Sequence, residues 1–121
     1  MARILVAEDD GALRGLLTTV LSSAGHEVHA AADGAQALLA AKEFRPHLLL
    51  TDYIMPALDG LELVEAVWSL PGMAALPVIV FSAYAPDTRL RPFLETSKVR
   101  HVLKGRRLAH LVDEVDSLLS S

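Results

Sequence analysis

The chain has 121 residues, of which 52% are hydrophobic and 21% charged, and its 15 acidic and 11 basic side chains give a net charge of −4. This balance predicts one globular domain over residues 1–121 and excludes a disordered chain. The acidic charge argues against direct nucleic-acid binding, and the lack of cysteine excludes disulfides and thiolate metal sites. With no evident signal peptide or membrane-length apolar run, we expect a cytoplasmic protein without membrane insertion.

Five short apolar runs alternate with five segments of helical periodicity. A continuous apolar run bounded by turn residues is typical of a strand in a parallel sheet that is covered on both faces. The expected strands are residues 4–7, 28–31, 48–51, 78–81 and 99–103. The expected helices are residues 13–24, 34–44, 61–68, 86–97 and 108–119. Pro92 falls inside the fourth helix and should kink, shorten or break it.

This alternation predicts an α/β fold with a doubly wound parallel sheet. Right-handed crossovers between parallel strands place helices on both faces of such a sheet. Asp52 would then lie beside Glu8 and Asp9 if the first and third strands are neighbours and the second strand lies outside them.

Polar side chains stand at the carboxyl ends of four of the expected strands. They are Glu8, Asp9, Asp52, Ser82 and Lys104. Because the carboxyl ends of parallel strands share one edge of the sheet, we expect these side chains to converge where open α/β sheets bind their ligands.

The converging side chains have the chemistry of phosphoryl transfer. Clustered carboxylates either have raised pKa values or hold a cation, and oxygen-only ligands favour Mg²⁺ or Mn²⁺. A carboxylate beside such a metal can attack phosphorus, which makes Asp52 the expected nucleophile. The transferred group carries charge on three oxygens, for which the metal, the Lys104 ammonium and the Ser82 hydroxyl are the expected partners. Ala83 is small enough to let a donor approach in line.

In this order and spacing, the same residues resemble the receiver domain of two-component response regulators, of the single-domain chemotaxis type. The matching segments are residues 4–10 (Ile-Leu-Val-Ala-Glu-Asp-Asp), 51–60, 82–83 and 102–104, and the resemblance covers essentially the whole chain. The resemblance, rather than the spacing, implies a flavodoxin-like five-stranded sheet in the order 2-1-3-4-5.

The resemblance implies roles for the acidic residues. Asp52 would accept a phosphoryl group from a histidine kinase or a histidine phosphotransfer protein. Glu8, Asp9 and Asp52 would bind Mg²⁺, with the backbone carbonyl of Ile54 as a further ligand. The chain would not be an enzyme in the ordinary sense, because it would catalyse only its own Mg²⁺-dependent phosphorylation and dephosphorylation. Phosphorylation would change the binding of a downstream protein that the sequence does not identify, and we expect a monomer or a weak dimer.

Two residues depart from the family's pattern. The resemblance implies that Ser82 would swing toward the phosphoryl group and that Lys104 would pair with it. However, Gly105 follows Lys104 at the position where the family has a proline after a cis peptide bond. A cis bond before a non-proline residue costs about 2.5–4 kcal/mol, so we expect a trans bond and a different loop shape. His101 occupies the position of an aromatic switch residue, and it could equally be a partly buried strand residue with a satisfied ring nitrogen.

Two bulky side chains flank the expected site. Ile54 lies two residues beyond Asp52, and Tyr84 lies two residues beyond Ser82. With Ala83 they would control access to the phosphoryl group, and we hypothesise that they shield it from water.

Two other functions remain open at this point. A phosphate-independent receiver-like interaction module would have the same fold, and His101 and Gly105 mildly favour it. A metal-dependent phosphohydrolase is disfavoured, because no second carboxylate follows Asp52 at a spacing suited to acid–base catalysis.

Overall fold

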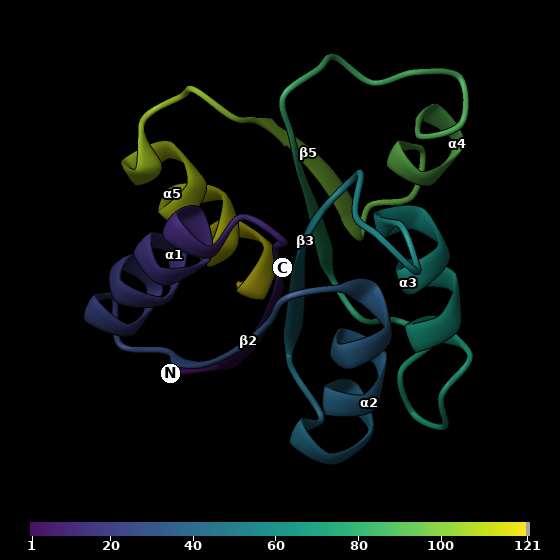
Figure 1. Ribbon diagram of the computed structural model, residues 1–121, viewed down its shortest axis with the longest axis horizontal. Helices are drawn as coiled ribbons and strands as arrows, with labels where there is room; N and C mark the ends of the chain where they lie inside the picture. Colours follow the sequence, from purple (N-terminus) through teal and green to yellow (C-terminus); the bar gives the residue numbers. More distant parts are fainter. Residues whose placement is uncertain (121) are drawn as a thin grey trace.

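The computed structural model describes residues 1–120 and shows a parallel sheet between two layers of helices (Figure 1). The strands are β1 (Arg3–Ala7), β2 (Glu27–Ala31), β3 (Leu48–Asp52), β4 (Val78–Ser82) and β5 (Val99–Leu103). The helices are α1 (Gly11–Ser23), α2 (Gly34–Phe44), α3 (Gly60–Trp68), α4 (Arg91–Leu94) and α5 (Leu108–Leu119). In the described part of the chain, no helix has both the length and the apolar character that a membrane span needs.

The strands lie in the order β2-β1-β3-β4-β5, and every neighbouring pair is parallel. This confirms the expected order. Ala7 pairs with Thr51, so the chain segments that follow β1 and β3 leave the sheet side by side. Ser82 pairs with Leu103, which brings the residue after β5 to the same edge. The pairing register therefore sets where the functional side chains meet.

The sheet separates two apolar cores. Leu5 and Leu49 face the layer of α2, α3 and α4, whereas Ile4 and Leu48 face the layer of α1 and α5, which lie together on the other side (Figure 1). All four side chains are fully buried, and burial of each leucine or isoleucine contributes about 1.5–3 kcal/mol. Coverage on both faces explains why β3 and β4 are apolar along most of their length.

Aspartate is the N-cap residue of three helices. The side chains of Asp10, Asp33 and Asp59 accept hydrogen bonds from backbone N–H groups in the first turns of α1, α2 and α3. Such caps contribute about 0.5–2 kcal/mol each and satisfy donors that the helix leaves unpaired. Asp10 is thus the capping residue of α1, as its position indicates.

The expected helix over residues 86–97 is present only as the four residues of α4, which confirms that the segment containing Pro92 is shortened. Pro92 is the second residue of α4, where its missing N–H does no harm, and residues 88–90 before it form a single turn in which the Arg91 N–H donates to the Asp87 carbonyl at 3.0 Å. Leu90 is nevertheless fully buried, and the Phe93 ring lies 6.1 Å from the Trp68 ring of α3. These contacts hold the short helix on the sheet.

Gly60 lies where the turn after β3 approaches α3 most closely. A Cβ atom at this position would come within 2.2 Å of the Asp52 carbonyl oxygen, and the Gly60 N–H donates to the Tyr53 carbonyl at 2.7 Å. Only a residue without a side chain lets the turn close at this distance. The position of Asp52 therefore depends on this glycine.

We predict that Gly60→Ala lowers the free energy of unfolding by about 1–3 kcal/mol, because the added methyl group forces the backbone apart. Gly15→Ala is the matched control, since nothing lies within 4 Å of a Cβ at this exposed position of α1. This control should stabilise the protein by about 0.5–1 kcal/mol. Urea denaturation of both variants measures the difference, and equal stabilities would contradict the steric account.

Candidate functional site

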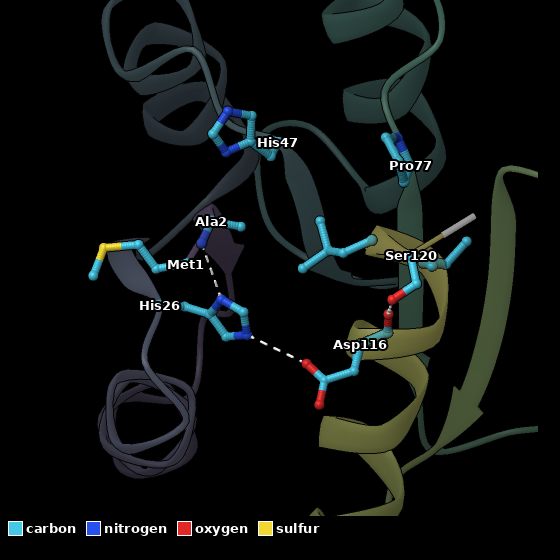
Figure 2. A pocket seen from close by; sticks show the side chains of 9 residues that line it. Met1, Ala2, His26, His47, Pro77, Asp116 and Ser120 are labelled. Atoms are coloured by element: carbon cyan, nitrogen blue, oxygen red, sulfur yellow. Dashed lines mark hydrogen bonds and ion pairs between the residues drawn. The ribbon is translucent and has the colours of Figure 1, made fainter.

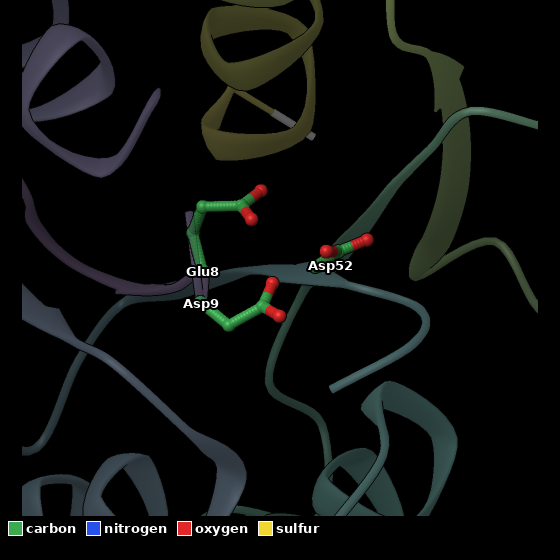
Figure 3. A group of neighbouring side chains, drawn as sticks. All are labelled: Glu8, Asp9 and Asp52. Atoms are coloured by element: carbon green, nitrogen blue, oxygen red, sulfur yellow. The ribbon is translucent and has the colours of Figure 1, made fainter. Parts of the chain in front are cut away.

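Three carboxylates meet at the carboxyl edge of the sheet (Figure 3). Glu8 and Asp9 follow β1, Asp52 is the last residue of β3, and one oxygen of each lies within 4.8 Å of the others. Glu8 is only 1% exposed and Asp52 is buried, whereas Asp9 is open to solvent. Three converging carboxylate oxygens fit the ligand preference of a hard divalent cation, so this cluster could hold a metal ion.

Lys104 bridges two of these carboxylates. Its Nζ lies 3.0 Å from Glu8 Oε1 and 3.1 Å from Asp52 Oδ2. Burial by itself lowers the pKa of the Lys104 ammonium, but the two carboxylates outweigh it and raise the pKa above its ordinary value. No cis peptide bond occurs within residues 1–120, which confirms the expected trans bond before Gly105, a residue with φ of +93°. The lysine reaches the carboxylates despite the different loop.

Glu8 is the most deeply buried of the three acidic residues. Burial raises the pKa of its carboxyl group to about 7, although hydrogen bonds from the Asp10 N–H and from Lys104 act in the opposite direction. The negative charge of Asp52 adds to the rise. In the metal-free protein the Glu8 carboxyl therefore takes up a proton near neutral pH, and a cation in the cluster would favour its charged form.

The Ser82 hydroxyl is held by the β4–α4 loop rather than by Asp52. Its Oγ donates to the Tyr84 carbonyl at 3.2 Å and accepts from the Tyr84 N–H at 3.1 Å. The Asp52 carboxylate instead accepts a hydrogen bond of 2.8 Å from the N–H of Tyr53. Ser82 is thus at the site, with its hydroxyl turned to its own loop.

His101 contacts the same carbonyl group. Its Nε2 lies 3.0 Å from the Tyr84 oxygen, and because a carbonyl only accepts, Nε2 carries the hydrogen. Burial lowers the pKa of His101 below its ordinary value. The structure therefore shows a partly buried ring with a satisfied nitrogen, and the role of His101 as a switch residue stays a prediction. The Tyr84 carbonyl accepts from both Ser82 and His101.

The access residues surround a small hollow beside Asp52. The hollow measures about 260 Å³ and is lined by Asp52, Tyr53, Ile54, Ser82, Ala83, Tyr84 and Lys104. The side chains of Ile54 and Tyr84 are 68% and 72% exposed, so both project into solvent around the hollow. The ligand role of the Ile54 backbone carbonyl stays a prediction.

Some contacts at the site were not evident from the sequence. Arg14, one helical turn beyond Asp10, donates from Nη1 to the carbonyl oxygen of Glu8 at 2.9 Å and so supports the acidic segment. Tyr53 and Arg89 join the loop after β3 to the loop after β4 through hydrogen bonds to acidic side chains. No spacing rule pairs residues in two such loops, so only the folded chain shows these contacts.

A second hollow, of about 550 Å³, lies at the opposite edge of the sheet (Figure 2). There His26 Nδ1 accepts from the Ala2 N–H at 3.2 Å, and His47 Nδ1 accepts from the Arg3 N–H at 2.9 Å. The neutral rings therefore carry their hydrogens on Nε2, which leaves neither ring with a free lone pair for a metal. His26 Nε2 lies 3.5 Å from the Asp116 carboxylate. These histidines anchor the start of β1 to its two neighbouring strands.

Solved structures share this fold over nearly the whole chain. The chemotaxis protein CheY4 of Vibrio cholerae is 24% identical, with a TM-score of 0.90 and coverage of 98% of both chains. The receiver domain of sensor histidine kinase PA1611 from Pseudomonas aeruginosa PAO1 is 25% identical, with a TM-score of 0.87 and coverage of 99% of this chain and 98% of that one. That structure holds a magnesium ion in its active site cleft. The flavodoxin-like fold is thereby confirmed.

The curated relatives align with this chain over only about half of their own length. The DNA-binding response regulator MtrA of Mycobacterium tuberculosis is 31% identical over 97% of this chain and 50% of its own. The transcriptional regulatory protein PrrA of the same organism is 37% identical over 97% of this chain and 49% of its own. The chain thus spans about half the length of the curated relatives it matches. Residues 4–116 match the family model of the response regulator receiver domain, and the chain belongs to this family of two-component signalling domains.

Proposed function

We propose that this receiver domain is a signalling switch in which Asp52 takes a phosphoryl group from a histidine kinase or a histidine phosphotransfer protein. The observation that carries the proposal is the setting of the Asp52 carboxylate. It lies at the hollow between Ile54 and Tyr84, with the Lys104 ammonium 3.1 Å away and the Glu8 and Asp9 carboxylates beside it.

The transfer forms one bond and breaks another. An Asp52 carboxylate oxygen attacks the phosphorus atom of the donor phosphohistidine, and the electron pair of the broken P–N bond leaves with the donor imidazole. The product is an acyl phosphate on Asp52. The Lys104 ammonium pairs with one phosphoryl oxygen, and the Ser82 hydroxyl rotates away from the Tyr84 carbonyl to donate to another. The small Ala83 leaves the approach line open.

Glu8, Asp9 and Asp52 would hold Mg²⁺, or Mn²⁺ in its place, with the Ile54 carbonyl as a further ligand. Bound Mg²⁺ supplies positive charge that offsets the clustered carboxylates and the incoming phosphoryl oxygens. The three-carboxylate geometry and the magnesium ion in the receiver domain from P. aeruginosa both support this choice.

The output of the switch is a change in protein binding. Movement of Ser82 away from the Tyr84 carbonyl changes the contacts of the β4–α4 loop and of His101, which shifts the domain toward a conformation that a downstream protein binds. The name of MtrA describes a DNA-binding protein, but half of that protein lies outside the match, and we propose no DNA contact for the present domain. The phosphate-independent alternative is disfavoured, because Lys104 reaches both carboxylates despite Gly105.

Incubation with acetyl phosphate and Mg²⁺ should add one phosphoryl group, observed by intact mass. Asp52→Asn should abolish the adduct, because the amide is not a nucleophile here, and omission of the metal should do the same. Asp113→Asn, at an exposed position of α5, is the matched control and should be phosphorylated normally. An adduct that persists in Asp52→Asn would overturn the assignment of the acceptor.

The metal-free protein should lose stability as the pH rises from about 4.5 to 7. The pKa of Glu8 is raised to about 7 by folding, so the folded state binds more protons in this range and the unfolding free energy falls with rising pH. We expect a loss on the order of 1–3 kcal/mol, which Glu8→Gln should remove and Mg²⁺ should oppose. Denaturation in chelator, compared between wild type and Glu8→Gln, measures it. A pH profile unchanged by the substitution would rule out Glu8 as the cause.

Replacement of both Ile54 and Tyr84 by serine should shorten the lifetime of the phosphoprotein. Removal of the two bulky side chains opens the hollow to water, and a tenfold faster decay corresponds to a barrier about 1.4 kcal/mol lower. Intact mass followed over time after removal of the donor gives the decay rate. Leu39→Ser, at an exposed apolar position of α2, is the control. An unchanged decay rate in the double variant would sink the shielding hypothesis.

A further inference from the structure

Two contacts join the loop after β3 to the loop after β4, and together we name them the loop latch. The Tyr53 hydroxyl lies 2.9 and 2.8 Å from the two carboxylate oxygens of Asp87. The Arg89 guanidinium donates to both carboxylate oxygens of Asp59, at 2.6 and 3.1 Å. The Arg89–Asp59 contact is a bidentate pair at the surface, and its fork geometry fixes the relative orientation of the two groups. The single hydrogen of the Tyr53 hydroxyl is shared between the two Asp87 oxygens.

The β3–α3 side of the latch is firmly placed. Asp59 is the N-cap of α3 and forms a capping box with Glu62. Tyr53 directly follows the phosphoacceptor, donates its N–H to the Asp52 carboxylate, and accepts from Gly60 through its carbonyl. A strand end and a helix start therefore fix both latch residues on this side.

On its other side, the latch involves the exposed loop between β4 and α4, which is attached to the core at its α4 end. The Asp87 carboxylate also accepts from the N–H groups of Arg89 and Leu90, and the Leu90 side chain is fully buried. Only residues 83–86 lie between the end of β4 and Asp87. This short span contains Tyr84, whose carbonyl holds the Ser82 hydroxyl at 3.2 Å. The latch thus fixes one end of the span that positions Ser82, and β4 fixes the other.

We propose that Tyr53 and Arg89 are positioning residues for the phosphorylation switch: through the loop latch they hold the β4–α4 loop in the arrangement that keeps the Ser82 hydroxyl on the Tyr84 carbonyl. Ser82 can donate to a phosphoryl group on Asp52 only after it leaves this carbonyl. The latch therefore stabilises the resting conformation against the phosphorylated one. This inference rests on the proposed function of Asp52.

A latch that favours the resting conformation lowers the affinity for any ligand that binds only the conformation in which Ser82 has left the Tyr84 carbonyl. The apparent affinity falls in proportion to the fraction of molecules in the competent conformation. Removal of the latch should therefore strengthen the binding of a phosphoryl mimic. A role confined to keeping the site intact predicts the reverse, because a damaged site binds more weakly.

The test is the affinity for beryllofluoride, which mimics a phosphoryl group on a carboxylate, measured with Mg²⁺ present. Trp68 is the sole tryptophan, and its ring lies 6.1 Å from Phe93 of α4, so its fluorescence reports on this region. Tyr53→Phe removes only the hydroxyl group, and Arg89→Gln removes the guanidinium fork. We expect each variant to bind about threefold to tenfold more tightly than wild type. Arg91→Gln makes the same charge change at an exposed neighbouring position and should bind like wild type.

Amide hydrogen exchange of residues 83–85 in the unliganded protein tests the latch without any ligand, and we expect faster exchange in both latch variants. Unchanged exchange, or beryllofluoride binding that is unchanged or weaker in the variants while wild type binds, would overturn the inference and leave the proposed function standing. A wild-type protein that binds no beryllofluoride would instead overturn the proposed function, and the inference with it.

Discussion

Lys104 stands between two carboxylates that the sheet forces together, and the rest of the site depends on this ion pair. Parallel pairing of β1 with β3 sets Glu8 and Asp52 at adjacent strand ends, at distances of 3.0 and 3.1 Å from the lysine. Like charges in a partly buried setting repel, and the apolar burial of the strands opposes that repulsion. The Lys104 ammonium offsets this repulsion, and the two cores on either side of the sheet hold the strand ends in place.

A single carbonyl group links the site to the neighbouring surface. The Tyr84 oxygen accepts from the Ser82 hydroxyl and from His101 Nε2, so a rearrangement of one partner alters the setting of the other. His101 makes this contact through an imidazole nitrogen on β5, so the β4–α4 loop is tied to the neighbouring strand. Ser82 and His101 are coupled through the Tyr84 carbonyl as long as both remain within hydrogen-bond distance of its oxygen.

Much of this arrangement could be read from residue order. The apolar runs and the polar residues that end them predict the strands and the shared edge of the sheet, because strand patterning is regular along the chain. The pairing of β1 with β3, which brings Glu8 and Asp9 to Asp52, came from the resemblance, because parallel pairing joins residues that are far apart in the sequence. Pro92 indicated that α4 would be shortened, but the four-residue extent of the helix was not predictable, because the conformation of the flanking residues depends on their tertiary contacts. The Tyr53–Asp87 and Arg14–Glu8 contacts depend on loop conformations, which side-chain spacing does not encode.

The brevity of α4 has a consequence for local stability. A helix of four residues has almost no internal hydrogen bonding of its own, and an isolated segment of that length does not stay helical in water. It is held chiefly by the buried Leu90 and by the packing of Phe93 on Trp68. Such a segment opens at a free-energy cost well below that of global unfolding. A protein that binds over α4 would therefore also suppress this local opening.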